Sequence, residues 1–150
     1  MKIENRFIQP NDFYKVSELS DFIFQSVSNK SFFSWDRQSL LSELKTKTSG
    51  VLASENQKIL GFIVFREAED LIDIMTLGTD PQYRGQGIMS DLLQYLLKYS
   101  SKENKKVLLE VHEENRLAIQ LYLKMGFQVL YKRERYYKDG GNALVMVYGS

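Results

Sequence analysis

Two glycines in a short polar stretch constrain this chain more than any other feature of its sequence. The stretch runs from Asp80 to Gly87, after an apolar β-branched run and before a run with helical periodicity. Glycine adopts backbone conformations that other residues avoid, so this segment can curl and point successive amide groups into one concavity. The positive N-terminal end of the next helix would face the same concavity. The pattern therefore predicts a pyrophosphate-binding turn, with an ordinary turn and helix start as the alternative.

Two narrower glycine motifs do not fit this stretch. A dinucleotide-binding Gly-x-Gly-x-x-Gly motif directly follows its strand, whereas here Asp80 to Arg84 intervene and Ser90 occupies the third glycine position. A nucleoside-triphosphate loop needs Gly-Lys-Ser/Thr, and that triplet is missing. Neither narrower motif therefore identifies the ligand of this turn.

Hydrophobic periodicity predicts the element order β-α-α-β-β-β-α-β-α-β-β. The expected strands cover residues 2–9, 51–53, 59–65, 71–77, 107–111, 127–137 and 143–148, and the expected helices cover 13–27, a short segment after Asp36, 87–101 and 116–125. Three consecutive strands with short turns imply antiparallel pairs, and the strand–helix–strand unit after residue 71 implies a parallel pair. We expect a mixed α/β class, with one domain over residues 1–150 and a central mixed sheet of about seven strands flanked by about four helices.

Composition excludes several kinds of catalytic equipment. The chain has no cysteine and a single histidine, His112. Disulfides, thiolate metal sites and cysteine nucleophiles are therefore ruled out, and we expect no metal. His112 is predicted to be a surface residue just past a strand. Because 20 Lys and Arg nearly balance 19 Asp and Glu, we expect no direct nucleic-acid partner.

The sequence shows neither of the usual signals for membrane targeting. Residues 1–10 lack the apolar centre of a signal peptide. No apolar run approaches the roughly 18 residues that suggest a membrane span. We expect a soluble cytoplasmic protein with no membrane partner, either a monomer or a homodimer.

The glycine turn also resembles the signature of the GNAT (Gcn5-related) acetyltransferases. Their pattern Arg/Gln-x-x-Gly-x-Gly/Ala maps onto Arg84, Gly87 and Met89. Met89 departs from the small residue of that pattern, so its side chain must point away from the cofactor or the helix start must shift. A second block, E-V-x-x-x-N-x-x-A-x-x-L-Y-x-x-x-G-F, runs from Glu110 to Phe127 and resembles the second half of the same family.

Shorter matches resemble the bacterial ribosomal-protein alanine N-acetyltransferases. They are the turn Phe33-Ser34-Trp35-Asp36 and the pair Tyr136-Tyr137 before the last strand. The resemblance implies transfer of an acetyl group from acetyl-CoA to a primary amine by direct attack, with a protein N-terminal α-amine as the expected acceptor. A small amine acceptor (polyamine, amino sugar or amino-acid derivative) remains an alternative, as does a non-catalytic acyl-CoA-binding sensor.

The same resemblance implies catalytic roles for Glu110 and Tyr122. A protein α-amine has a pKa of about 7.7–8.0, so a modest base such as Glu110 suffices, directly or through a water. Tyr122 would protonate the leaving thiolate, whose conjugate acid has a pKa near 8.5. The structural alternatives are an ion-paired glutamate at a strand end and a core tyrosine on an apolar helix face.

The resemblance assigns the CoA contacts mainly to backbone groups. The amide of Leu77 would stabilise the oxyanion, beside a bulge for which Gly78 is suited. The main chain of Leu77 to Thr79 would pair with the pantetheine arm, and the amides from Gly85 to Ser90 would hold the pyrophosphate. The complete set of expected cofactor-binding residues is Leu77, Gly78, Thr79, Arg84, Gly85, Gln86, Gly87, Ile88, Met89, Ser90 and Asn115.

Aromatic residues are the candidates for the acceptor groove. Tyr136 and Tyr137 are expected on one wall and Trp35 on the other. Strand alternation would place the two tyrosines on opposite faces, so only one would reach the groove unless the strand bulges there.

Overall fold

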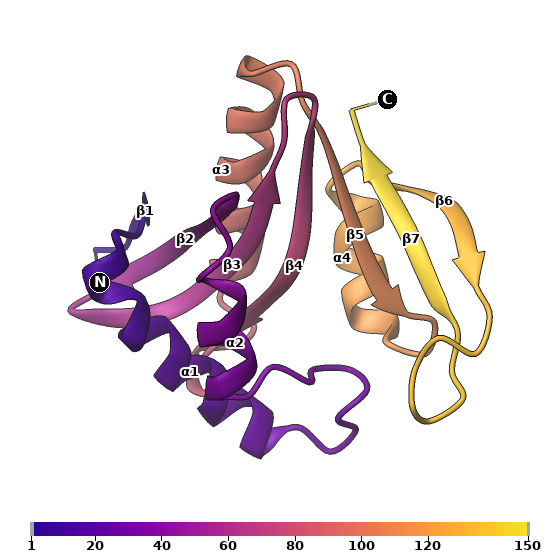
Figure 1. Ribbon diagram of the computed structural model, residues 1–150, viewed down its shortest axis with the longest axis horizontal. Helices are drawn as coiled ribbons and strands as arrows, with labels where there is room; N and C mark the ends of the chain where they lie inside the picture. The colour runs from indigo at the N-terminus through magenta and orange to yellow at the C-terminus, as the bar shows by residue number, and fades with distance from the viewer. Residues whose placement is uncertain (1, 150) are drawn as a thin grey trace.

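A seven-stranded mixed sheet, in the order β1-β2-β3-β4-β5-β7-β6, forms the centre of the computed structural model, which describes residues 2–149 (Figure 1). The strands are β1 (Glu4–Phe7), β2 (Ser49–Asn56), β3 (Lys58–Glu67), β4 (Leu71–Thr79), β5 (Lys106–His112), β6 (Gln128–Arg133) and β7 (Ala143–Tyr148). The helices are α1 (Phe13–Ser26), α2 (Arg37–Glu43), α3 (Ile88–Lys102) and α4 (Arg116–Lys124), with short 3-10 helices at Pro10–Asp12 and Pro81–Tyr83. The predicted class and the predicted order of helices and strands are confirmed.

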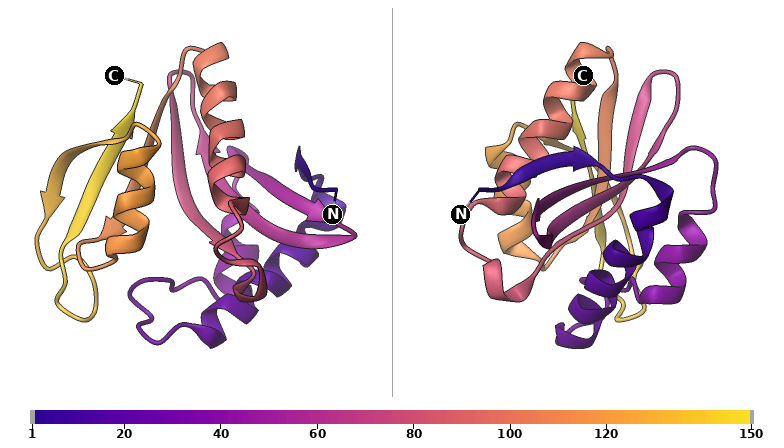
Figure 2. Two further views of the ribbon diagram at one scale, coloured as in Figure 1. Left: turned by 180° about the vertical axis from the view of Figure 1, so that it is seen from behind. Right: turned by 90° about the vertical axis from the view of Figure 1, so that its left-hand side faces the viewer.

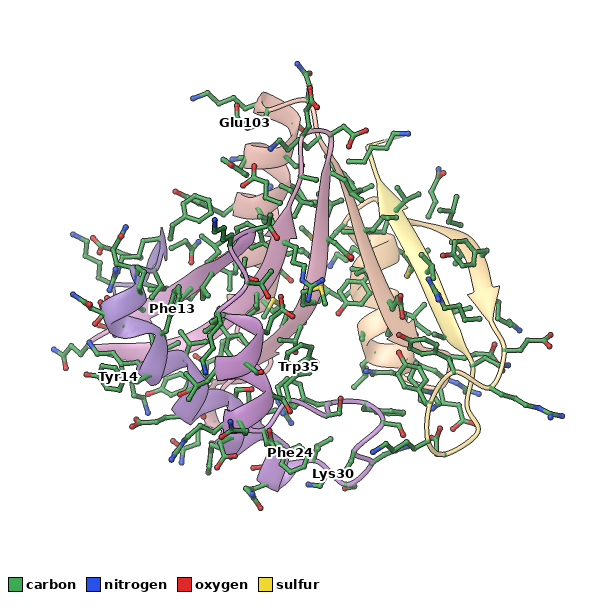
Figure 3. The ribbon with its side chains drawn as sticks, in the orientation of Figure 1. Phe13, Tyr14, Phe24, Lys30, Trp35 and Glu103 are labelled. Atoms are coloured by element: carbon green, nitrogen blue, oxygen red, sulfur yellow. The ribbon has the colours of Figure 1, made fainter. Side chains whose placement is uncertain are left out.

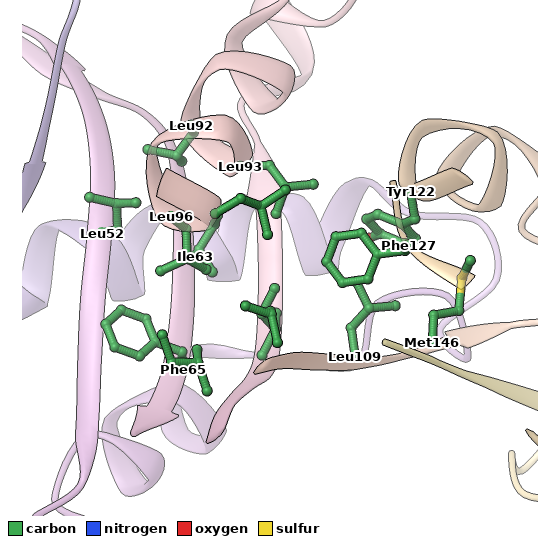
Figure 4. Packing of buried hydrophobic residues seen from close by; sticks show 14 of the residues in the cluster. Leu52, Ile63, Phe65, Leu92, Leu93, Leu96, Leu109, Tyr122, Phe127 and Met146 are labelled. Atoms are coloured by element: carbon green, nitrogen blue, oxygen red, sulfur yellow. The ribbon is translucent and has the colours of Figure 1, made fainter. Parts of the chain in front are cut away.

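Helices cover both faces of the sheet. The pair α3 and α4 lies on one face and the pair α1 and α2 on the other (Figure 2). In α3, Leu92, Leu93 and Leu96 are fully buried and pack with Ile63 and Phe127 (Figure 4). Each such side chain contributes about 1.5–3 kcal/mol by leaving water. No helix within residues 2–149 is both long enough and apolar enough to cross a membrane.

The parallel strands β4 and β5 pair only at their beginnings. The paired residues run from Leu71 to Asp73 on β4 and from Lys106 to Leu108 on β5, and beyond them the strands diverge. All other neighbouring strands pair antiparallel. The divergence leaves one edge of the later part of β4 without a neighbouring strand.

The bulge in β4 lies earlier than the sequence suggested. Val64 faces Thr76 and Phe65 faces Ile74, so Met75 is the extra residue. Gly78 instead pairs regularly with Phe62. A Cβ there would lie 2.7 Å from Cδ1 of Ile23 in α1, so a larger residue would require that side chain to shift.

The strand predicted to reach Tyr137 ends at Arg133. Arg135 then takes a positive φ of 50°, which breaks the extended backbone. The connection to β7 is closed by hydrogen bonds from Tyr137 N to Gly141 O (3.1 Å) and from Gly140 N to Tyr137 O (2.9 Å). The hairpin predicted from the glycine pair is therefore present, but its connecting loop is longer.

Candidate active site

The divergence of β4 and β5 opens a cavity of about 970 Å³. Its lining combines both strands, the beginning of α4, the loop between α1 and α2, and the loop between β6 and β7. Predicted site residues that line it are Trp35, Leu77, Gly78, Thr79, Arg84, Glu110, Asn115, Tyr122, Tyr136 and Tyr137. The turn residues from Gly85 to Ser90 follow Arg84 and lie outside this lining.

The backbone of β4 presents an unpaired edge to the cavity. Asp80 N donates to Leu60 O at 2.8 Å, so residue 80 directs its polar groups toward β3. Because these directions alternate along a strand, Leu77 and Thr79 direct their N–H and C=O groups the other way, where β5 has diverged. In the first part of β4 the Leu71 carbonyl accepts a hydrogen bond from Ala68 N. There the odd-numbered residues therefore direct their backbone N–H and C=O groups toward β3. The extra residue Met75 shifts this alternation by one position, so that beyond it the even-numbered residues face β3 and the Leu77 amide faces the cavity.

The glycine turn has the conformation that an anion-binding loop needs. Gly85 and Gly87 take φ values of 77° and 79°, and a Cβ on either would meet no atom within 4 Å. Glycine is thus required by the backbone conformation rather than by crowding, and the space beside the turn is open. Gly87 caps α3 without a side-chain hydrogen bond, so the first amides of that helix can bind an anionic group.

Met89 does not obstruct this turn. Its partly buried side chain packs against the core beneath α3, and the preceding Ile88 is buried. The larger residue at the position of a family Gly or Ala therefore points into the protein. The turn and the unpaired edge of β4 together fit a ligand that has a pyrophosphate at one end and amide groups along its arm.

Tyr122 combines a buried ring with a hydroxyl that reaches the cavity. The residue is 5% exposed, and its ring lies 5.9 Å from that of Phe127. Within residues 2–149 its hydroxyl makes no hydrogen bond, yet no fully buried polar side-chain atom there lacks a partner. The hydroxyl is therefore open to the cavity. Burial, and secondarily Tyr137, raises the pKa of Tyr122, which keeps it protonated at neutral pH.

Glu110 projects into the cavity from β5 with one-third of its side chain exposed. Arg133 Nε lies 3.6 Å from Oε1, which is too long for a hydrogen bond. The structural alternative of a pair with Lys105 is not realised, because Lys105 Nζ lies 2.6 Å from Glu67. The alternative of a pair with another cation is met instead by Arg133, and the residue also lines the cavity.

Asn115 supplies an amide side chain at the beginning of α4. Its backbone N–H donates to His112 O at 2.9 Å, but its side chain makes no capping hydrogen bond. The side chain lines the cavity instead. Asn115 is therefore the N-terminal cap residue of α4, although its side chain makes no capping hydrogen bond.

Both tyrosines of the β6–β7 loop line the cavity. Their rings meet edge to face at 5.1 Å. The expected split between opposite faces is wrong because β6 ends at Arg133, before either tyrosine. Trp35 lies at the other side of the cavity, near α2 (Figure 3). Burial first and then Glu110 raise the pKa of Tyr137 to about 12.

His112 is buried, contrary to the surface position that we expected. The centre of its ring lies 4.9 Å from that of Phe32 and 4.8 Å from that of Tyr137, which stacks on it. Nε2 lies 2.8 Å from Asp139 Oδ2, and Nδ1 accepts from the backbone N–H of Glu114, so the neutral ring carries its proton on Nε2.

Asp139 extends this contact to the other loop. Its Oδ2 also accepts from Asn29 Nδ2 at 3.2 Å, and Asn29 belongs to the loop between α1 and α2. We call the contacts of Asn29, His112 and Asp139 the clasp. Sequence reasoning missed the clasp because its members are far apart in the chain.

Comparisons with known proteins agree with this geometry. The model of the acetyltransferase (GNAT) family matches residues 13–127. The [ribosomal protein bS18]-alanine N-acetyltransferase of Haemophilus ducreyi is 29% identical over 75% of this chain and 81% of its own length. The N-alpha-acetyltransferase RimI of Mycobacterium tuberculosis is 41% identical, but the match spans only 46% of this chain and 42% of that protein.

Solved structures show the same fold. The crystal structure of the ribosomal-protein-S18-alanine N-acetyltransferase from Escherichia coli superposes with a TM-score of 0.83. It covers 97% of this chain and 92% of its own, at 23% identity. The family model covers most of the chain. The chain therefore belongs to the GNAT family of acetyltransferases.

Proposed function

We propose that this enzyme transfers the acetyl group of acetyl-CoA to the α-amine of a protein N-terminus. One observation carries the proposal: Glu110, the Tyr122 hydroxyl and the unpaired amide of Leu77 all face one cavity. Relatives named as N-terminal or ribosomal-protein N-acetyltransferases support the choice of acceptor.

The backbone would hold acetyl-CoA along one line. The unpaired groups of Leu77 and Thr79 can bond the amides of the pantetheine arm as an added strand would. The amides of the glycine turn and the first turn of α3 can bond the pyrophosphate. Arg84, which lines the cavity beside that turn, adds a positive charge.

The side chains divide the proton transfers. Glu110 accepts a proton from the α-amine, directly or through a water, and the freed nitrogen forms a bond to the acetyl carbon. The Leu77 N–H donates to the oxygen that gains negative charge. As the carbon–sulfur bond breaks, Tyr122 gives its proton to the leaving sulfur, which departs as the thiol. The remaining excess proton of the acylated nitrogen passes to the Tyr122 oxygen, and Glu110 releases its proton to water.

An α-amine suits this equipment better than a lysine side chain does. The pKa of an α-amine is about 7.7–8.0, whereas that of lysine is about 10.4. Deprotonating a lysine at neutral pH therefore costs roughly 3–4 kcal/mol more. Deprotonation of an α-amine therefore needs neither a cysteine base nor a metal-bound base.

The test is a thiol-release assay with acetyl-CoA and two acceptor panels. One panel contains short peptides that begin with alanine or serine, and the other contains polyamines, amino sugars and amino-acid derivatives. Because the chain has no cysteine, a thiol reagent reports only released CoA. We expect turnover with the peptides; turnover only with small amines contradicts the proposal. Binding of acetyl-CoA without turnover would indicate a sensor. Cytoplasmic location and oligomeric state stay predictions.

A further inference from the structure

Asp73 is a cavity carboxylate without a cation. It is the last residue of β4 that pairs with β5, and it lines the cavity half-buried. Within residues 2–149 its side chain forms neither a hydrogen bond nor an ion pair shorter than 4 Å. The proton-transfer roles proposed for Glu110 and Tyr122 do not explain why an acidic residue lies at position 73.

The natural partner of Asp73 is bound elsewhere. Arg66 lies directly opposite it on β3. The guanidinium instead forms a bidentate contact with Glu43, with Nε–Oε2 at 2.7 Å and Nη2–Oε1 at 2.8 Å. Ser49 Oγ donates to the same carboxylate at 2.8 Å. The hydrogen bond from Arg66 is the main cause that lowers the pKa of the buried Glu43, so Arg66 is not free for Asp73.

The charges around Asp73 leave an excess of negative charge. Since Asp73 pairs with Leu108, Glu110 lies two residues further along β5 on the same face of the sheet. Burial raises the pKa of Asp73, and Glu110 raises it further. Glu43 acts in the same direction, whereas Arg66 and Arg133 act against it from outside contact distance. A cation bound between Asp73 and Glu110 would act against both causes that raise the pKa of Asp73, its burial and the charge of Glu110.

We propose that Asp73 binds the ammonium form of the acceptor and positions it for Glu110. This inference rests on the proposed function. At neutral pH most α-amines are protonated, so the acceptor arrives as a cation. Asp73 holds that cation by a charge-assisted hydrogen bond, Glu110 removes one proton from its nitrogen, and the neutral amine attacks. Asp73 therefore acts in capture of the acceptor, and Glu110 acts in proton removal.

The kinetic test uses Asp73→Asn, which keeps the volume of the side chain. Its control is Asp70→Asn, because Asp70 is exposed in the turn before β4. At pH 6.5 we expect Asp73→Asn to raise the KM for an alanine-initiated peptide by about 10–100-fold, with a much smaller change in kcat and with acetyl-CoA affinity unchanged. Asp70→Asn should match the wild type. The KM difference should shrink at pH 9, where the amine is neutral. An unchanged KM, or an equal rise at both pH values, overturns the inference.

An equilibrium measurement separates this inference from the proposed function. Calorimetry at pH 6.5 with CoA present compares the free peptide with the same peptide carrying an N-terminal acetyl group. The wild type should bind the free peptide more tightly, and Asp73→Asn should lose that preference. Equal binding of the two peptides by the wild type overturns the inference. Absence of turnover with every acceptor would instead refute the proposed function, and the binding comparison would still decide the role of Asp73.

Discussion

Replacing Gly141 with alanine tests whether the buried His112 holds the tyrosine wall of the cavity in place. A Cβ on Gly141 would lie 2.2 Å from Nε2 and 2.4 Å from Cε1 of His112. The φ of Gly141 is not positive, so alanine costs nothing in backbone conformation. The imidazole is buried in contact with the rings of Phe32 and Tyr137, so it has little room to move. The clash must therefore break the contact with Asp139 and displace Tyr137.

The magnitude follows from two losses. Overpacking a well-filled site costs about 1–3 kcal/mol, and losing the hydrogen bond between His112 and Asp139 costs about 0.5–1.5 kcal/mol more. We expect Gly141→Ala to lower the free energy of unfolding by about 2–4 kcal/mol and the Tm by roughly 5–15 °C. Because Tyr137 lines the cavity, kcat/KM for the acceptor should fall by about 10–100-fold.

Urea unfolding of a double-mutant cycle gives the decisive measurement. In a His112→Ala background the two shortest contacts are gone and a contact of 2.9 Å with Asp139 Oδ1 remains, so most of the cost of Gly141→Ala should disappear. The neighbouring Gly140→Ala is the control, because Gly140 has a φ of 83° and an added Cβ meets nothing within 4 Å. Its cost of about 1–2 kcal/mol should persist in both backgrounds. Equal costs of Gly141→Ala with and without the imidazole would refute the reasoning.

Three further variants test the chemistry and the charges of the site. Glu110→Gln should lower kcat by about 10²–10⁴-fold, most at low pH where the acceptor keeps its proton, and an unchanged pH–rate profile would remove Glu110 as the base. Tyr122→Phe should lower kcat within about the same range with acetyl-CoA affinity unchanged, whereas a wild-type rate would leave Tyr122 a packing residue. The contact of Arg66 lowers the pKa of Glu43, so the pair stabilises the fold fully above the ordinary glutamate pKa and loses this contribution as the pH falls through the lowered value. Glu43→Gln should therefore flatten the fall in unfolding free energy below about pH 4, measured with urea; an unchanged slope contradicts this assignment.

The elements of the fold were predictable wherever local pattern and final packing agree. Leucines at helical spacing predicted α3, and the structure buries the same side chains. The end of β6 was not predictable, because the alternation of residues 127–137 continues past the residue where Arg135 turns the backbone. The position of the bulge also depends on pairing between strands, which a single strand's sequence does not contain.

The candidate site shows the same division. Arg84, Gly87 and Glu110 lie in local motifs, so the sequence could place them. Asp73 has no motif, and its role depends on Arg66 pairing with Glu43 from α2. The surface position predicted for His112 was wrong for a similar reason, since no residue near it in the sequence indicates that Asp139 is its partner.

The clasp also explains how a sheet that divides in its middle can keep a defined cavity. Beyond Asp73 the two halves of the sheet share no ladder hydrogen bonds, so pairing holds them together only at the beginnings of β4 and β5. At the other end, Asn29 from the first half meets Asp139 from the second, and Asp139 contacts His112 on β5. In Figure 1 the loops that carry Asn29 and Asp139 approach each other below the divergence. The cavity is thus bounded by strand pairing at one end and by the clasp at the other, while the core beneath α3 packs against both halves of the sheet.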